Sequence, residues 1–201
     1  MLKGLAQTVP VDNIAEYFTE VGRVCSSAKV TDAEGRSLSL PSAFHWVAER
    51  SRSAQQNTNK LILIGNGGSA AIASHQAIEF LKNGGIRALA LNDGASLTAL
   101  ANDFGYQNVF AEQLKMLGRK GDVLIAISSS GQSTNILKAV ETARAQDISV
   151  VTFTGFRPDN LLRSLGDINF YVDSDQYGFV EIAHHVLIQA ILDLNVIPNR
   201  P

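Results

Sequence analysis

The 201-residue sequence has few cysteines, few charged residues and no excess of either sign of charge. Its single cysteine, Cys25, excludes an internal disulfide and is typical of a reducing cytosol. The net charge is −2 and the basic residues do not cluster, which argues against a nucleic-acid footprint. No uninterrupted apolar run reaches the length of a membrane span, and the N-terminus lacks the pattern of a secretory signal. We therefore expect a cytoplasmic protein with no nucleic-acid and no membrane partner.

Two nucleotide-binding patterns are also missing. Residues 65–70 read GNGGSA in place of the dinucleotide fingerprint G-x-G-x-x-G, and no Walker lysine follows. Asp93 comes directly after an expected strand, which leaves a nucleotide as one alternative. The composition, 45% hydrophobic and 18% charged, is that of a chain with a sizeable folded core.

From residue 60 onward the pattern of apolar segments predicts an α/β fold. The expected strands cover residues 60–64, 86–91, 122–127, 149–154 and 168–172. The expected helices cover residues 70–82, 96–117 with a break near 103–105, 134–146, 159–165 and 177–194. Apolar strands that alternate with helices indicate a parallel sheet covered on both faces. We expect a five-stranded parallel sheet in flavodoxin-like order, which makes a three-layer sandwich.

Residues 1–58 have a different pattern and are expected to form an N-terminal helical segment, with residues 59–201 as the α/β domain. An apolar stripe predicts a helix over residues 11–28, and a serine-rich linker is expected at residues 27–40. Pro41 suits the start of a second helix that runs to about residue 56. The two helices cannot bury both apolar faces alone, so they pack on another subunit, across the sheet, or as a cap on the monomer.

Two loops rich in small polar residues follow the first and third expected strands. In the run GNGGS at residues 65–69, Gly67 and Gly68 allow close approach of a ligand to the amides that start the next helix. The run SSSGQS at residues 128–133 adds four hydroxyl groups. The loops are neighbours at the carboxyl ends of the expected strands, which predicts a site for a phosphate monoester. The alternative is a tight connection at the first loop and a helix cap at the second.

Two helices carry candidates for proton transfer or metal binding. His75 and Glu79 lie four residues apart, a spacing that suits a metal pair, a base with its orienting partner, or a surface ion pair. Glu181, His185 and Gln189 form a polar stripe on the last helix. Their partners would be a metal, a substrate, another subunit, or solvent at the helix edge.

Asn102 and Asp103 follow an apolar helical run and precede Gly105. Either their side chains contact substrate hydroxyls, or they only form the end of a helix and the turn that follows it.

These motifs together resemble the sugar isomerase (SIS) domain family, and within it the phosphoheptose isomerases. The matching segments are GNGGSAA with the H-x-x-x-E pair, LTALANDFGY, GDVLIAISSSGQS-x-N and VTFTG, and the similarity extends over nearly the whole chain. The resemblance implies a flavodoxin-like sandwich that assembles as a homotetramer with active sites between subunits. It also implies the conversion of a ketose phosphate to an aldose phosphate through an enediol.

The resemblance assigns roles to matching positions. It implies phosphate binding by Ser128, Ser129, Ser130 and Ser133, and sugar binding by Asn66, Gly67, Gly68, Ser69, Asn102, Asp103 and Glu181. It places His75, Glu79, His185 and Gln189 at the catalytic centre. Some members bind zinc, for which the matching positions are His75, Glu79, Glu181 and Gln189. Glu79 is our candidate for the base, because burial can bring a glutamate pKa close to the working pH.

The last helix departs from the family pattern. The family has a glutamine followed eight residues later by a histidine that acts as an acid/base, and Glu181 and Gln189 stand at those positions. Glutamine cannot transfer a proton, so His185 takes the role, the reaction differs, activity is lost, or the alignment is shifted by one residue. The expected function is isomerisation of sedoheptulose 7-phosphate to a glycero-manno-heptose 7-phosphate with Glu79 as base. The alternatives are a non-catalytic scaffold, like the DnaA initiator-associating protein, and a sugar-phosphate sensor.

Overall fold

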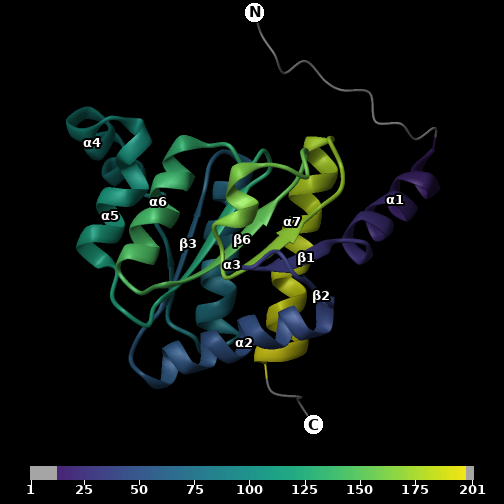
Figure 1. The fold of residues 1–201 in the computed structure, drawn as a ribbon, viewed down its shortest axis with the longest axis horizontal. Helices are drawn as coiled ribbons and strands as arrows, with labels where there is room; N and C mark the ends of the chain where they lie inside the picture. The colour runs from purple at the N-terminus through teal and green to yellow at the C-terminus, as the bar shows by residue number, and fades with distance from the viewer. Residues whose placement is uncertain (1–12, 198–201) are drawn as a thin grey trace, which may run out of the picture.

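The computed structural model describes residues 13–197 and shows one mixed sheet between two layers of helices (Figure 1). The strands are β1 (Lys29–Asp32), β2 (Ser37–Leu38), β3 (Leu61–Gly65), β4 (Ala88–Ala90), β5 (Val123–Ser128), β6 (Ser149–Thr154) and β7 (Ile168–Tyr171). The α-helices are α1 (Ile14–Ser26), α2 (Leu40–Gln56), α3 (Gly68–Lys82), α4 (Gly94–Phe104), α5 (Val109–Leu117), α6 (Thr134–Ala145) and α7 (Tyr177–Ile191). Two 3-10 turns, η1 (Tyr106–Asn108) and η2 (Leu161–Ser164), and a π-helical turn, η3 (Leu192–Val196), complete the elements.

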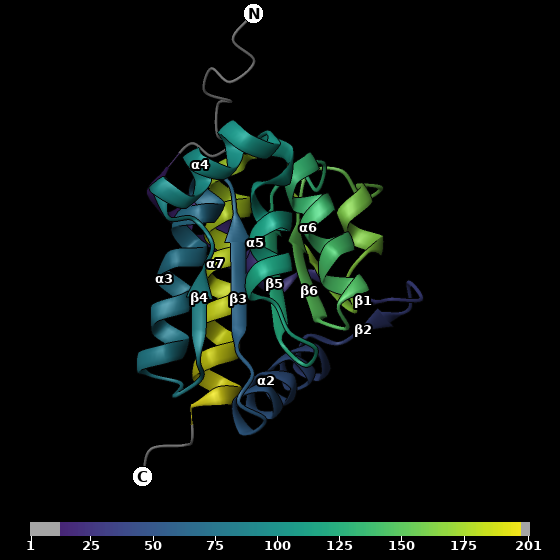
Figure 2. The ribbon, with the colours of Figure 1, turned by 90° about the vertical axis from the view of Figure 1, so that its left-hand side faces the viewer.

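The predicted α/β fold and its five parallel strands are confirmed. The strand order is β2-β1-β7-β6-β5-β3-β4, and the neighbours from β7 to β4 all pair in parallel. This is the predicted flavodoxin-like order, because the chain crosses from β4 over β3 to β5. Figure 2 shows α3 and α7 on one face of the sheet and α5 and α6 on the other. Strands β3 and β5 are fully buried, as expected for a sheet covered on both sides.

The sheet has seven strands, two more than the five predicted, and both additional strands lie in residues 27–40, where the prediction of a linker was wrong. That segment contains a β-hairpin, and β1 pairs antiparallel with β7. The hairpin turns at Gly35, whose φ of 77° is left-handed, and the Asp32 carboxylate accepts hydrogen bonds from the amides of Glu34 and Arg36. Val30 carries the hairpin into the core. Val30 is the only apolar residue of β1, beside the buried but polar Thr31, and a single apolar residue gives no strand signal in the sequence.

Other predicted boundaries shift for local reasons. The helix expected at residues 159–165 is only the turn η2, and the strand expected at residues 86–91 shortens to β4. The expected break near residues 103–105 is confirmed at Gly105, whose φ of 80° ends α4. Residues 11 and 12 of the first predicted helix lie outside the described residues.

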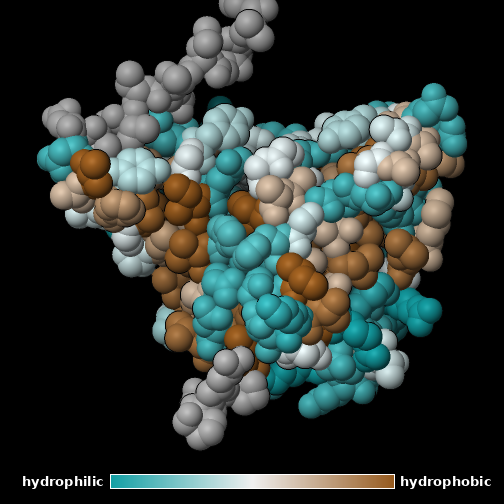
Figure 3. Space-filling model, turned by 180° about the vertical axis from the view of Figure 1, so that it is seen from behind, coloured by the Kyte–Doolittle hydropathy of each residue, from teal (hydrophilic) through white to brown (hydrophobic). Residues whose placement is uncertain are grey.

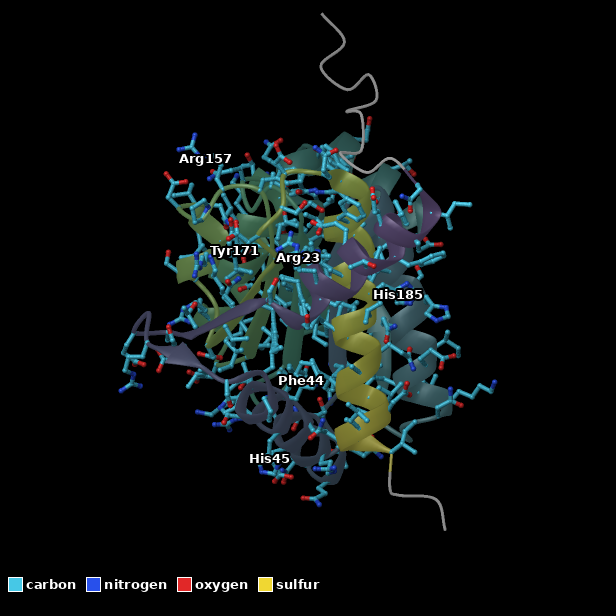
Figure 4. The ribbon with its side chains drawn as sticks, turned by 90° about the vertical axis from the view of Figure 1, so that its right-hand side faces the viewer. Arg23, Phe44, His45, Arg157, Tyr171 and His185 are labelled. Carbon is cyan, nitrogen blue, oxygen red and sulfur yellow. The ribbon has the colours of Figure 1, made fainter. Side chains whose placement is uncertain are left out.

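The N-terminal helices pack on the same core as the sheet. Helix α2 contributes Ala43, Phe44 and Val47 to the hydrophobic cluster beneath α3 and α7. Figure 4 shows Phe44 on the side of α2 that faces the sheet and His45 on its outer side. Helix α1 contacts α7, where the rings of Tyr17 and Phe179 lie 5.1 Å apart. The division of the chain at residue 58 stays a prediction.

Asp122 ties the first residues of β3 and β5 together. Its fully buried carboxylate lies 2.6 Å from Lys60 Nζ and also accepts hydrogen bonds from the Lys60 and Arg119 amides and from Asn59 Nδ2. Leu61 therefore lies opposite Val123, and the register carries Gly65 opposite Ile127 at the other ends of the strands. A one-residue slip would break this set of bonds and reverse the side chains.

Helix α7 with its π-helical turn is long and apolar. By length and composition alone, Tyr177–Val196 could cross a membrane, with a mean hydropathy of 1.3. It is not an uninterrupted apolar run, because Glu181, His184, His185, Gln189 and Asp193 lie within it. Half of the stretch is buried, and α7 contacts α1, α2 and α3, which is the usual situation of a core helix.

His184 is a titratable group at the centre of this packing. The side chain is fully buried, its Nε2 lies 3.0 Å from the Thr154 carbonyl oxygen, and its Nδ1 has no partner among residues 13–197. Burial lowers the pKa of His184 from 6.5 to about 4, although the Thr154 hydrogen bond acts in the opposite direction. The fold therefore holds the neutral imidazole.

This burial predicts a specific loss of stability in acid. The unfolded chain takes up a proton on His184 near pH 6.5 and the folded chain only near pH 4, so protonation favours unfolding between these values. The loss from this group is about 3 kcal/mol, at 1.36 kcal/mol per pKa unit. Urea unfolding from pH 7.5 to 4 should show a smaller fall in unfolding free energy for His184→Gln than for the native protein.

The matched control is His45→Gln, because His45 is exposed on α2. That variant should keep the native pH dependence. An equal fall for His184→Gln and the native protein would contradict the prediction.

Candidate functional site

A pocket of about 240 Å³ lies at the carboxyl ends of β3 and β5, and we call it the anion pocket. It is lined by Asn66, Gly67, Gly68, Ser69, Ile127, Ser128, Ser129, Ser130, Ser133, Tyr177 and Glu181. The two predicted loops therefore do meet, and α7 supplies a third wall. Tyr177 and Ile127 are lining residues that sequence reasoning did not assign.

The glycine turn brings backbone amides to this pocket. Gly67 has a φ of 54° and precedes α3, whose first turn has no side-chain cap. A Cβ on Gly65 would lie 2.5 Å from the Ser69 backbone, so β3 and α3 approach as closely as glycine allows. The uncapped amides and the helix dipole make this end of α3 favourable for an anion.

The serine loop supplies hydroxyl groups. Ser128 Oγ donates to Ser133 Oγ over 3.3 Å, and Ser130 Oγ accepts from the Gln132 amide. Ser129 is 6% exposed, and its Oγ has no hydrogen-bond partner among residues 13–197. Buried hydroxyls are normally paired, so this one is available to a ligand.

A hydrogen-bonded chain that the sequence did not reveal holds the glycine turn. Tyr106 Oη donates to Asn66 Oδ1 over 2.8 Å. The side-chain amides of Asn66 and Asn135 exchange two hydrogen bonds, each of 2.9 Å. Asn135 is buried in the first turn of α6. Tyr106 and Asn135 each end a motif used for the family resemblance, which was the available signal, but their link through Asn66 depends on tertiary structure.

A second hollow, of about 620 Å³, lies between α3 and α7, and we call it the α3–α7 groove. It is lined by His75, Glu79, Ile182, His185, Val186, Gln189, Ala190 and Asp193. The rings of His75 and His185 lie 4.8 Å apart, edge to face, and Glu79 accepts a hydrogen bond from Asn83. Figure 4 shows His185 on the outer side of α7, next to α3.

The predicted site residues thus divide between two hollows. Glu181 lines the anion pocket, whereas His75, Glu79, His185 and Gln189 line the groove. Asn102 and Asp103 lie exposed on α4, bond each other, and line neither hollow.

Burial perturbs the pKa of one α7 residue at each hollow, Glu181 and His185. Burial raises the pKa of Glu181. Burial lowers the pKa of His185, and the neighbouring charge of His75 lowers it further. The imidazole of His185 is therefore neutral at neutral pH and able to accept a proton.

The zinc implied by the family resemblance does not fit these side chains. Among residues 13–197, no three His, Cys, Asp or Glu side chains come together in a way that could hold a metal ion. Gln189 Oε1 accepts from Gln76 and Gln189 Nε2 donates to Asp193, so this side chain is already engaged. Glu181 lies in the other hollow, so the four family positions do not form one ligand set.

Comparison with known proteins agrees with this geometry. The SIS domain family matches residues 16–155. The phosphoheptose isomerase of Helicobacter pylori is 38% identical over 166 residues, which cover 80% of this chain and 84% of that protein. The enzyme of the same name from Shewanella frigidimarina is 35% identical over 191 residues, or 91% of this chain and 93% of that protein.

Solved structures give the same result. The phosphoheptose isomerase GmhA of Neisseria gonorrhoeae superposes with a TM-score of 0.77 at 35% identity, covering 90% of this chain and 96% of that one. A phosphoheptose isomerase from Francisella tularensis gives a TM-score of 0.76 at 27% identity, with coverage of 90% and 95%. The chain belongs to the SIS domain family and, within it, to the phosphoheptose isomerases.

Proposed function

We propose that the protein interconverts sedoheptulose 7-phosphate and a glycero-manno-heptose 7-phosphate. The observation that carries this proposal is that α3 and α7 both run from the anion pocket to the α3–α7 groove. Glu181 in the pocket and His185 in the groove are four residues apart, or about 6 Å along the helix. A sugar whose phosphate occupies the pocket would therefore extend its carbon chain toward the groove.

In this proposal the pocket binds and orients the phosphate. The hydroxyls of Ser128, Ser129, Ser130 and Ser133 and the amides of the glycine turn surround its oxygens. No lysine or arginine lines the pocket within residues 13–197, so hydrogen bonds and the dipole of α3 supply the attraction. Fixing one end of an open-chain sugar brings its carbonyl end to the same place in each encounter.

Glu79 is the base in this mechanism. It removes the proton from the hydroxyl-bearing carbon beside the carbonyl, the C–H electrons form the carbon–carbon double bond, and the carbonyl oxygen takes up a proton to give the enediol. Return of a proton to the neighbouring carbon, with loss of a hydroxyl proton, forms the aldose. A positioned base of this kind contributes roughly 10² to 10⁴ in rate.

His185 is our assignment for the second proton-transfer group. Gln189 has no titratable proton and is held by Gln76 and Asp193. His185 lies one helical turn nearer the anion pocket, beside His75, in the same groove as Glu79. With this assignment both proton-transfer groups, Glu79 and His185, line the α3–α7 groove.

We further propose that the protein is a homotetramer in the cytoplasm. Figure 3 shows apolar side chains around polar ones on the side of the molecule that α3 and α7 cover. Ile78 and Leu81 on α3 and Ile182 and Val186 on α7 are 37–50% exposed. Exposed apolar residues beside a polar groove are typical of subunit contacts.

Gln189 favours a second candidate function, because a glutamine stands where the family has its histidine acid/base. A scaffold of the DnaA initiator-associating type would bind no sugar phosphate, and a sensor would bind it without reaction. Calorimetry with sedoheptulose 7-phosphate separates the scaffold from the other two, and isotope exchange separates the sensor from the enzyme.

Solvent deuterium exchange tests the isomerase step. The native protein in D₂O should incorporate deuterium into sedoheptulose 7-phosphate, detected by NMR or mass spectrometry. Glu79→Gln should exchange at least about 100-fold more slowly, because an amide cannot remove the proton. Glu141→Gln, an equal charge change on the exposed side of α6, should exchange at the native rate. Absence of exchange in the native protein would refute the isomerase, and native exchange in Glu79→Gln would refute its role as base.

The assignment of His185 makes a separate kinetic prediction. His185→Gln should lower kcat about 100-fold with little change in KM, as expected for a group that acts in proton transfer. Gln189→Met removes the polar group but keeps the length of the side chain, and its kcat should stay within about threefold of native. If Gln189→Met loses as much activity as His185→Gln, the assignment is wrong.

A further inference from the structure

Glu181 places a carboxylate inside a pocket that otherwise favours anions. A Cβ added to Gly68 would lie 2.5 Å from both carboxylate oxygens of Glu181, so these oxygens lie directly over Gly68 at the start of α3. Among residues 13–197, Glu181 has neither a hydrogen-bond partner nor an ion-pair partner. Its charge is therefore free to act on a ligand in the pocket.

The opposite wall supplies an independent sign of a ligand. The buried Ser129 Oγ has no partner within the described chain and lines the same pocket. A phosphate monoester satisfies this hydroxyl and the uncapped amides of α3. Glu181 and Ser129 line the same pocket of about 240 Å³, so a phosphate bound there lies in one hollow with the carboxylate.

Glu181 cannot accept a hydrogen bond from a deprotonated phosphate, because both groups are acceptors. What it accepts is a hydrogen bond from a hydroxyl on the carbon chain next to the phosphate. A second acidic group at that position would meet the Glu181 charge directly, and two like charges repel more strongly in a partly buried site than in bulk water. Burial already raises the pKa of Glu181, which shows that the site holds even one carboxylate charge at a cost.

We propose that Glu181 is a specificity residue that restricts the anion pocket to phosphate monoesters whose adjoining carbons carry neutral hydroxyl groups, and that it excludes phosphorylated sugar acids. The inference rests on the proposed phosphate-binding role of the pocket and is independent of the isomerase reaction. It defines the acceptable substrates by the phosphate-bearing end of the molecule, whatever chemistry takes place at the other end.

Two small molecules isolate this effect. Glycerol 3-phosphate and 3-phosphoglycerate share the phosphate and the adjoining hydroxyl, and differ only in a neutral hydroxymethyl against a carboxylate. Calorimetric titration of the full chain should give an affinity for glycerol 3-phosphate about tenfold higher than for 3-phosphoglycerate, after screening of the repulsion by salt. In Glu181→Gln the ratio should fall to within about twofold, mainly through tighter binding of 3-phosphoglycerate.

Glu141→Gln is the control for net charge, and it should keep the native ratio because Glu141 is exposed on α6. Glu181→Ala is a second variant that removes the charge without adding an amide, and it should give the same low ratio. Circular dichroism of each variant shows that it is folded.

A native ratio near one, no binding of either molecule, or an unchanged ratio in both Glu181 variants would overturn the proposal. Because neither molecule is an isomerase substrate, these results stand apart from the exchange experiment. A protein that discriminates between them but exchanges no deuterium would refute the isomerase and leave the role of Glu181 intact.

Discussion

The pairing of β3 with β5 is the constraint on which the anion pocket depends. These strands are neighbours only because the chain reverses its winding direction at this point, with β4 on one side and β6 on the other. Asp122 fixes the register at one end of the pair, and the same register places Gly65 beside Ile127 at the other. The register aligns the first residues of β3 and β5, so their carboxyl ends also lie side by side. The amides of the glycine turn and the serine hydroxyls, which follow these ends, therefore lie close together. The buried carboxylate of Asp122, at the opposite ends of these two strands, thus helps to set the shape of the binding site.

Helix α7 distributes its side chains among three environments. His184 points to the sheet, where burial keeps it neutral, while His185 lies beside it in sequence and borders the α3–α7 groove. Glu181, one turn earlier than His185, borders the anion pocket. Successive turns of a rigid helix therefore separate phosphate recognition from the groups proposed for proton transfer, and packing against α1, α2 and α3 holds the spacing between them.

The sequence predicted those parts of the fold that have strong periodic signals. Long apolar strands and their helices identified the parallel core, and glycine and serine runs after the first and third strands identified the pocket. The hairpin of β1 and β2 was missed, because Val30 is its main contribution to the core and a single apolar residue has no period. Helical spacing correctly put Glu181, His185 and Gln189 on one stripe. It could not assign them to two hollows, because the neighbouring helix and loops decide that. The chain from Tyr106 through Asn66 to Asn135 joins three segments and is visible only after folding.

The short outer strands have a consequence for how the protein behaves at high concentration. The sheet ends in β2, which has two residues, and in β4, which has three, so few main-chain donors and acceptors remain free along either border. Exposed borders of long sheets recruit foreign strands and seed fibrils. The hairpin that sequence reasoning treated as a linker covers the longer strand β7, and it thereby protects the most apolar segment on that side from intermolecular pairing. The hairpin thus limits intermolecular strand pairing at this border of the sheet.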